Sequence, residues 1–196
     1  MDATARIGPN AITRVAEVMR ERFGPDGADG VFAAAGLSRY LAAPPERMVD
    51  EADVAALHRR LRETLGLQEA RRIGRDAGWR TGGYLLAHRI PRPVQWLLRA
   101  LPAPLAARAL LASIARHAWT FAGSGRFRVL HGTPLLLFIE GNPLCRGVRA
   151  DQPLCDFYAA TFERLFRALV HPAAQVREVA CESTGAPACV FEVRWS

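Results

Sequence analysis

The sequence contains no lysine, and all 26 of its positively charged residues are arginine. With 19 acidic residues, the formal net charge is +7. The arginines are spread along the chain with no more than two adjacent, whereas a nucleic-acid-binding surface gathers its basic residues in a patch or stripe. We therefore expect no nucleic acid partner, and an anionic ligand or a membrane surface is a better use of this charge.

Long hydrophobic runs are also absent. No stretch approaches the roughly 18 uncharged apolar residues that would span a bilayer. Residues 1–23 contain acidic side chains and no apolar run, so they do not resemble a secretory signal. We expect a cytoplasmic protein with at most peripheral contact with a membrane. Half of the 196 residues are hydrophobic, which excludes a disordered chain and is enough for one core.

The order of the hydrophobic patterns predicts an α+β protein, with N-terminal helices followed by an antiparallel sheet of β-β-α-β-β order. The expected helices span 11–23, 50–65, 67–88, 94–101, 105–121 and 151–169, and the expected strands span 126–131, 135–140, 176–182 and 188–195. Because Pro44 and Pro45 interrupt the pattern, we divide the chain into an N-terminal helical segment, 1–49, and a main domain, 50–196.

Small residues recur in the expected helix 67–88, where Gly74, Gly78 and Gly82 repeat every four residues on one face. Each glycine costs a helix about 1 kcal/mol. Such a strip therefore indicates that another helix, or a flat ligand, approaches the backbone closely. Further along, leucines between prolines (Leu97 and Leu105 among them) predict either core packing or an edge that touches a membrane.

Four cysteines lie in the last quarter of the chain: Cys145, Cys155, Cys181 and Cys189. Without a secretory signal, a metal site or buried free thiols explain them better than disulfides do. Cys181 and Cys189 are symmetric about Gly185 in a predicted turn, so they would oppose each other across a hairpin at a separation that suits two ligands of one tetrahedral zinc.

A third ligand is expected at the start of the preceding helix. Cys155 falls in the first turn of the expected helix 151–169, where the helix dipole favours a thiolate. The fourth position is then left to Glu178, Cys145 or water. The spacing lacks paired C-x-x-C motifs, so zinc and buried free thiols both remain open on spacing alone.

Residues 178–193 (EVACESTGAPACVFEV) resemble the C-terminal signature of the 4-vinyl reductase domain family. Residues 141–147 (GNPLCRG) and 153–158 (PLCDFY) fit it as well. Residues 78–91 (GWRTGGYLLAHRIP) and 117–125 (HAWTFAGSG) resemble a branch of the family that belongs to bacteriochlorophyll biosynthesis and is historically named 4-vinyl protochlorophyllide reductase. The resemblance covers roughly residues 57–195, and it makes the photosynthetic membrane the expected place of any peripheral contact.

The resemblance implies a mixed helix-sheet fold, homodimers, and a hydrophobic ligand bound by the domain 50–196. In the aromatic-sensing relatives, three cysteines and a glutamate hold zinc, which implies a structural zinc on Cys155, Glu178, Cys181 and Cys189 here. Cys145 is left outside this set. Glu178 and Cys181 are three residues apart, so a regular strand would point them to opposite faces, and the set requires a β-bulge between them.

The family name implies a reductase, but the residues indicate a binding module. No G-x-G-x-x-G follows a strand, and Gly123-Ser-Gly125 follows a helix, so a nicotinamide or flavin fingerprint is missing. A closed four-ligand zinc leaves no position open for chemistry. We expect an accessory protein that binds a tetrapyrrole precursor and presents it to a pathway enzyme such as magnesium chelatase. A reductase acting on divinyl protochlorophyllide and a sensor of small aromatics are the alternatives.

A tetrapyrrole pocket needs flat apolar walls and a few basic groups at its rim. Eight residues are expected to supply them: Trp79, Arg80, Tyr84, His88, Arg89, His117, Trp119 and Phe121. The aromatic residues would form the walls, next to the glycine strip. Arg80 and Arg89 would bind the propionates through paired hydrogen bonds. Either histidine is a candidate ligand for a central magnesium.

Overall fold

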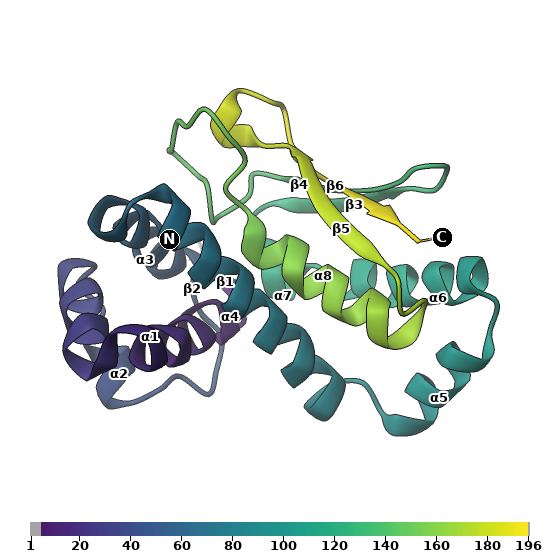
Figure 1. The fold of residues 1–196 in the computed structure, drawn as a ribbon, viewed down its shortest axis with the longest axis horizontal. Coiled ribbons are helices and arrows are strands. Elements are labelled where there is room, and N and C mark those ends of the chain that lie inside the picture. Colours follow the sequence, from purple (N-terminus) through teal and green to yellow (C-terminus); the bar gives the residue numbers. More distant parts are fainter. Residues whose placement is uncertain (1–4, 196) are drawn as a thin grey trace.

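The computed structural model of the protein describes residues 5–195. Helices make up most of the N-terminal half, and a four-stranded sheet with one crossing helix forms the C-terminal part (Figure 1). In chain order the elements are β1 (Arg6–Ile7), α1 (Asn10–Ala34), α2 (Arg39–Ala42), β2 (Val49–Asp50), α3 (Glu51–Leu65), α4 (Leu67–His88), α5 (Arg92–Ala100), α6 (Ala103–Arg116), α7 (Trp119–Ala122), β3 (Arg126–Leu130), β4 (Leu135–Glu140), α8 (Asp156–Leu169), β5 (Gln175–Ala180), the short 3-10 helix η1 (Glu182–Thr184) and β6 (Cys189–Arg194).

The main sheet confirms the predicted α+β class. Its strands run antiparallel in the order β3-β4-β6-β5, and α8 lies against one face (Figure 1). Alternate residues on that face are buried, including Leu137 and Ile139 of β4 and Phe191 of β6. The ring of Phe191 meets that of Phe162 on α8 edge-on, with centroids 5.6 Å apart. The period of two in the sequence therefore matches one buried face and one more open face.

The glycine strip of α4 is covered by α8. A Cβ atom on Gly78 would lie 2.1 Å from the carbonyl oxygen of Phe157, and one on Gly82 would lie 2.6 Å from Cβ of Arg164. Gly74 sits at ordinary contact distance from the same helix. The strip thus serves helix packing rather than a flat ligand, and the two helices approach backbone to backbone along it.

Two helix ends differ from the sequence prediction. The first helix was expected to stop before Gly24, but the chain only kinks there, at φ 72°, and α1 resumes through Pro25 to Ala34. Burial of Val31 and Phe32 holds this second half in the core. The expected helix 105–121 is divided into α6 and α7, because His117 has a non-helical backbone at the end of α6.

The last helix also begins later than expected, at Asp156 instead of residue 151 or 152. Cys155 is the residue before its first turn, and its backbone N–H donates to Oε2 of Glu178 at 2.7 Å. That carboxylate therefore satisfies one of the N–H groups at the start of the helix. Arg71 of α4 binds Asp156 at 2.8 Å, which ties the same helix end to α4.

The short strands β1 and β2 pair residues from both sides of the expected boundary at 49/50, with Arg6 opposite Asp50 and Ile7 opposite Val49. The division into 1–49 and 50–196 stays a prediction. Within residues 5–195, no helix combines the length and the apolar character needed to cross a membrane.

His58 is the buried histidine of α3. Its Nε2 lies 3.3 Å from the carbonyl oxygen of Ala11, and its ring meets Phe157 edge-on. Burial, with a smaller contribution from the charge of Arg62, lowers the pKa of His58 to about 3. The folded protein therefore holds this imidazole neutral, while the unfolded chain protonates it near pH 6.5.

Substituting alanine for two glycines of α4 tests the helix contact. We expect Gly78→Ala to lower the free energy of unfolding by about 1–3 kcal/mol, because the new methyl group collides with the α8 backbone. Gly83→Ala is the matched control, since nothing lies within 4 Å of its Cβ position, and it should raise stability by about 0.5–1 kcal/mol. Urea unfolding of both variants measures the difference, and equal effects would contradict the contact.

Acid should destabilise the protein through His58. Between pH 6.5 and about 3 the unfolded chain binds a proton that the folded protein does not, so stability is full above pH 6.5 and falls as the pH drops. From pH 7 to pH 5 the wild type should lose about 2 kcal/mol more than His58→Gln. Urea unfolding at both pH values measures this difference, and parallel losses would show that His58 is not the titrating group.

Candidate metal centre and predicted ligand residues

All four cysteines come together in one buried cluster, although they belong to separate elements. Cys155 precedes α8, Cys181 and Cys189 lie at the turn end of the β5–β6 hairpin, and Cys145 comes from the loop after β4. Their Sγ atoms all lie within 4.8 Å of one another. Ala180 pairs with Val190, next to the two hairpin cysteines, so the predicted opposition across the hairpin is confirmed.

The sulfur separations match a tetrahedral metal site. Four sulfurs bound at about 2.3 Å would lie about 3.8 Å from one another. Cys189 Sγ lies 3.5 Å from Cys145 Sγ, 3.7 Å from Cys155 Sγ and 3.6 Å from Cys181 Sγ. Cys155 Sγ and Cys181 Sγ are 3.9 Å apart. The cluster therefore fits one ion without rearrangement, and which ion it takes is a matter for proposal.

Polar groups around the cluster suit thiolate ligands. Asn142 donates from Nδ2 to Cys155 Sγ at 3.2 Å, and Ser183 donates from Oγ to Cys181 Sγ at 3.0 Å. Arg62 of α3 approaches from the other side and donates to the carbonyl oxygen of Leu144 at 3.0 Å. Burial lowers the pKa of Arg62, and the neighbouring thiols counteract this. Its guanidinium thus supplies positive charge beside a centre that thiolates would make negative.

Without a cation the thiols cannot all ionise. Burial, followed by the neighbouring sulfurs, raises the pKa of Cys155 well above its usual value, contrary to the lowering expected from the helix dipole. Hydrogen bonds from the other three cysteines lower the pKa of Cys181, which becomes the acceptor of the group. One sulfur therefore takes the charge while its neighbours keep their protons, and a metal ion would have to displace those protons.

Glu178 lies beside the cluster because β5 is irregular. The pairing with β6 shifts between Glu178 and Ala180, which confirms the bulge that the predicted ligand set requires. Glu178 Oε2 accepts the backbone N–H of Cys155, whereas Oε1 is buried with no hydrogen-bond partner among the described residues. Burial raises the pKa of Glu178 to about 8. A buried carboxylate oxygen without a partner is a candidate ligand atom.

Three of the predicted ligands, Cys155, Cys181 and Cys189, are thus brought together, and the roles of all four stay predictions. The structure also places Cys145 inside the cluster, although the sequence analysis left it out. Its signal in the sequence was present in the motif 141–147, where turn-forming residues surround it. Only long-range contacts reveal that this loop folds back over the hairpin.

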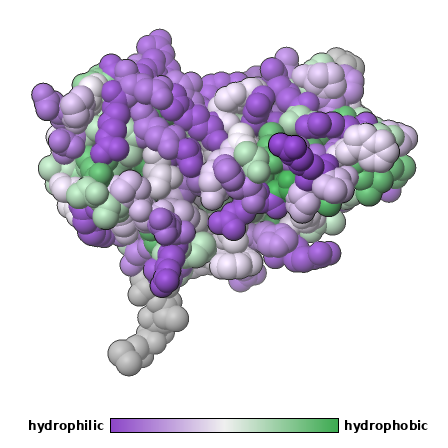
Figure 2. Space-filling model, turned by 90° about the horizontal axis from the view of Figure 1, so that it is seen from below, coloured by the Kyte–Doolittle hydropathy of each residue, from purple (hydrophilic) through white to green (hydrophobic). Residues whose placement is uncertain are grey.

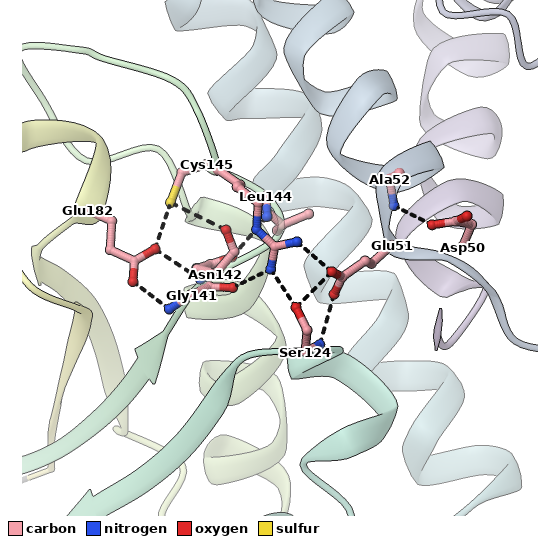
Figure 3. A network of polar contacts seen from close by, with 10 residues as sticks. Asp50, Glu51, Ala52, Ser124, Gly141, Asn142, Leu144, Cys145 and Glu182 are labelled. Carbon is pink, nitrogen blue, oxygen red and sulfur yellow. Dashed lines mark hydrogen bonds and ion pairs between the residues drawn. The ribbon is translucent and has the colours of Figure 1, made fainter. Parts of the chain in front are cut away.

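Two carboxylates hold that loop in place (Figure 3). Glu182 accepts the backbone N–H groups of Gly141 and Asn142 at 2.6 and 2.9 Å. On the other side, Glu51 of α3 binds Arg146, whose guanidinium also donates to the carbonyl oxygen of Gly141 at 2.8 Å. The network ties the start of α3 to the loop that carries the fourth cysteine (Figure 3).

The residues predicted to line a tetrapyrrole pocket fall into two groups. In the first, Trp79 lies under Arg164 of α8, and Arg80 is engaged by Glu21 of α1 at 2.6 Å. Tyr84 contacts the His88 ring, with centroids 4.8 Å apart. Arg89, together with Arg14 from α1, lies over the Tyr84 ring at 6.0 and 5.0 Å from its centroid. These residues form a surface of aromatic and basic groups on the C-terminal half of α4.

The second group lies elsewhere. Phe121 packs edge-on against Phe127 and belongs to the aromatic cluster around Tyr158 and Phe162 on α8. Trp119 is 60% exposed, and His117 is an exposed side chain that binds a carbonyl of its own helix. Because Trp79 and Phe121 contact different faces of α8, the two groups do not line one pocket. Ligand binding by either group stays a prediction.

A wide surface hollow of about 980 Å³ lies elsewhere, over β2 and the chain before it. Its lining includes Arg6, Arg39, Tyr40, Arg47 and Met48. The sequence analysis did not identify it, because these residues come from the segment 1–49, which showed no motif.

Comparison with known proteins matches residues 135–195 to the model of the 4-vinyl reductase domain. A bacteriochlorophyll synthase 23 kDa chain from Cereibacter sphaeroides is 53% identical over 96% of this chain and 90% of its own length. One from Rhodobacter capsulatus is 42% identical, over 97% and 87%. Two solved structures share the fold at 12% identity. They are an unliganded Fe(II) H-NOX protein from K. algicida, with a TM-score of 0.61 and 96% of both chains covered, and an H-NOX structure from a study of heme distortion, with a TM-score of 0.59 and 97% and 95% covered.

Metal analysis of the purified protein tests the centre. We expect close to one zinc per chain and loss of zinc in Cys181→Ser, with a lower free energy of unfolding because metal binding contributes to folding. A chelator should destabilise the wild type in the same direction. Less than about half an equivalent of zinc in the wild type would contradict the assignment.

The fourth ligand is decided by a pair of variants. With Glu178 as ligand, Cys145→Ala should keep its zinc, whereas Glu178→Gln should weaken zinc binding, by about 10–100-fold even if the carboxylate only orients Cys155. Cobalt substitution provides the control, since sulfur-to-cobalt absorption reports the number of thiolate ligands. If Cys145→Ala loses zinc as completely as Cys189→Ala, the ligand set is four cysteines.

Proposed function

The chain belongs to the family of the bacteriochlorophyll synthase 23 kDa chains, and we propose that it is an accessory protein of bacteriochlorophyll biosynthesis that binds a tetrapyrrole precursor and presents it to pathway enzymes. The observation that carries the proposal is 53% identity to one such chain over 96% of this one. Its partners would be the precursor, a second copy in a homodimer and a pathway enzyme such as magnesium chelatase.

The fold supports a macrocyclic ligand. The H-NOX structures that share it include one studied for heme distortion, and heme is itself a tetrapyrrole. The likeness covers nearly the whole of both chains, so it concerns the whole arrangement of helices and sheet. At 12% identity it supports the capacity of the architecture, and the contacting residues must be argued from this chain.

The surface on the C-terminal half of α4 is the best candidate for contact with a precursor. Tyr84 provides a flat ring, His88 stands beside it, and the guanidinium groups of Arg89 and Arg14 flank it. Arginine binds carboxylates in pairs of hydrogen bonds, which suits propionates. Arg80 is already engaged by Glu21, so Arg89 is the sharper site for a test.

The metal centre supports a carrier over a reductase. If the four ligand positions around zinc are filled by protein groups, the ion is closed and its contribution is to stability. The centre would then hold α8, the hairpin and the loop 141–146 together. A reductase of the 4-vinyl group is the alternative, carried by the family resemblance, and it needs a nicotinamide or other electron donor to bind.

Quenching of tryptophan fluorescence by protoporphyrin and its magnesium complex tests the proposal. We expect micromolar binding, weakened about 10-fold in Arg89→Ala because a propionate loses its partner. Arg177→Ala, on the distant strand β5, is the matched control and should bind as the wild type does. Arg6 and Arg14 are unsuitable controls, since Arg6 lines the surface hollow and Arg14 lies over Tyr84.

Two results would contradict the proposal. One is the absence of tetrapyrrole binding at micromolar concentrations. The other is conversion of a divinyl substrate to its monovinyl product by the pure protein with a nicotinamide donor, which would establish the reductase instead.

A further inference from the structure

Helix α5 turns hydrophobic side chains toward solvent. Trp96 is 73% exposed, Leu97 57% and Val94 44%, although the helix has only nine residues. Leu105, at the start of α6, is 50% exposed. Figure 2 shows hydrophobic groups gathered among hydrophilic ones on the side formed by these helices. An exposed apolar group of this kind marks an interaction surface.

The inward face of α5 is narrow and partly polar. Gln95 is buried, and its Nε2 donates to the carbonyl oxygens of Leu86 and Ile90 at 2.6 and 2.8 Å. Leu98 is the other buried residue of the helix. A polar side chain therefore points into the protein while a tryptophan and a leucine point out, so the outward position of the apolar stripe is fixed by specific hydrogen bonds.

Charge around this surface has one sign. From residue 77 to residue 139 the sequence contains no aspartate or glutamate. The same stretch holds eight arginines, namely Arg80, Arg89, Arg92, Arg99, Arg108, Arg116, Arg126 and Arg128. Arg92, Arg99 and Arg108 are exposed on α5 and α6 themselves. The apolar stripe thus lies among cations with no acidic residue of its own segment to neutralise them.

We propose that the surface formed by α5 and the start of α6 docks on an anionic lipid bilayer. Tryptophan and leucine beside arginine is the composition of helices that lie in a membrane interface, where the apolar groups enter the boundary of the acyl chains and the guanidinium groups bind lipid phosphates. The long arginine side chains reach the headgroups while Trp96 and Leu97 insert.

Charge also argues against a second copy of the chain on this surface. Two copies placed face to face through α5 would bring like charges together, with no acidic residue between 77 and 139 to pair with them. An anionic bilayer supplies both the apolar interior and the opposite charge. The inference is independent of tetrapyrrole binding, because it requires no ligand.

Sedimentation with large unilamellar vesicles tests the docking surface. The wild type should bind vesicles containing phosphatidylglycerol at least about 10-fold more tightly than pure phosphatidylcholine, and salt should weaken this binding. The double variant Trp96→Ser/Leu97→Ser should lose at least about 10-fold in binding. The matched control is Leu130→Ser, which removes a leucine that is 53% exposed on β3 and should leave binding unchanged.

A second readout follows the tryptophan itself. Brominated lipids should quench part of the protein's fluorescence, and Trp96→Phe should remove that part while the variant still binds. Arg92→Gln/Arg108→Gln should abolish the preference for anionic vesicles. The proposal is overturned if the wild type does not bind anionic vesicles or if Trp96→Ser/Leu97→Ser binds as well as the wild type. It is also overturned if that variant converts a vesicle-free dimer to a monomer, which would assign the surface to a second copy.

Discussion

Backbone contact between α4 and α8 is the constraint on which the rest of the structure depends. Gly78 leaves space that the carbonyl of Phe157 fills, so the two helix axes are held close at one place along their length. From there α8 presents its aromatic face to the sheet and its first residues to the cysteine cluster. Arg71, from the same helix as the glycines, binds Asp156 and fixes the end of α8 at which Cys155 lies.

The cysteine cluster is where separate parts of the chain meet. A helix start, a hairpin and a loop each contribute, and none of them would hold its sulfur in place alone. Glu178 connects two of these parts, since it lies on β5 and binds the backbone of Cys155. Burying several thiols and a carboxylate together is unfavourable unless a cation compensates them. The chain therefore concentrates at one point a cost that a bound metal would turn into stability.

Sequence periodicity predicted the strands to within two residues and the helices α3 and α4 almost completely, because each buries one regular face. It failed where a distant residue decides the local structure. The late start of α8 depends on Glu178, and the position of Cys145 depends on Glu182 and Arg146. The residues expected around one pocket form two groups for a related reason: they are close in the sequence pattern, but α8 separates them in space.

The buried amide of Gln95 has a kinetic consequence. Rolling α5 to hide its tryptophan would break two hydrogen bonds to the end of α4 and the residues after it, and would leave their carbonyls unsatisfied, which is costly inside a protein. The helix is therefore locked in rotation, and its outward side is preformed before any encounter. Association through such a rigid element needs no prior opening step, so its rate is governed by collision and electrostatic steering rather than by a conformational change.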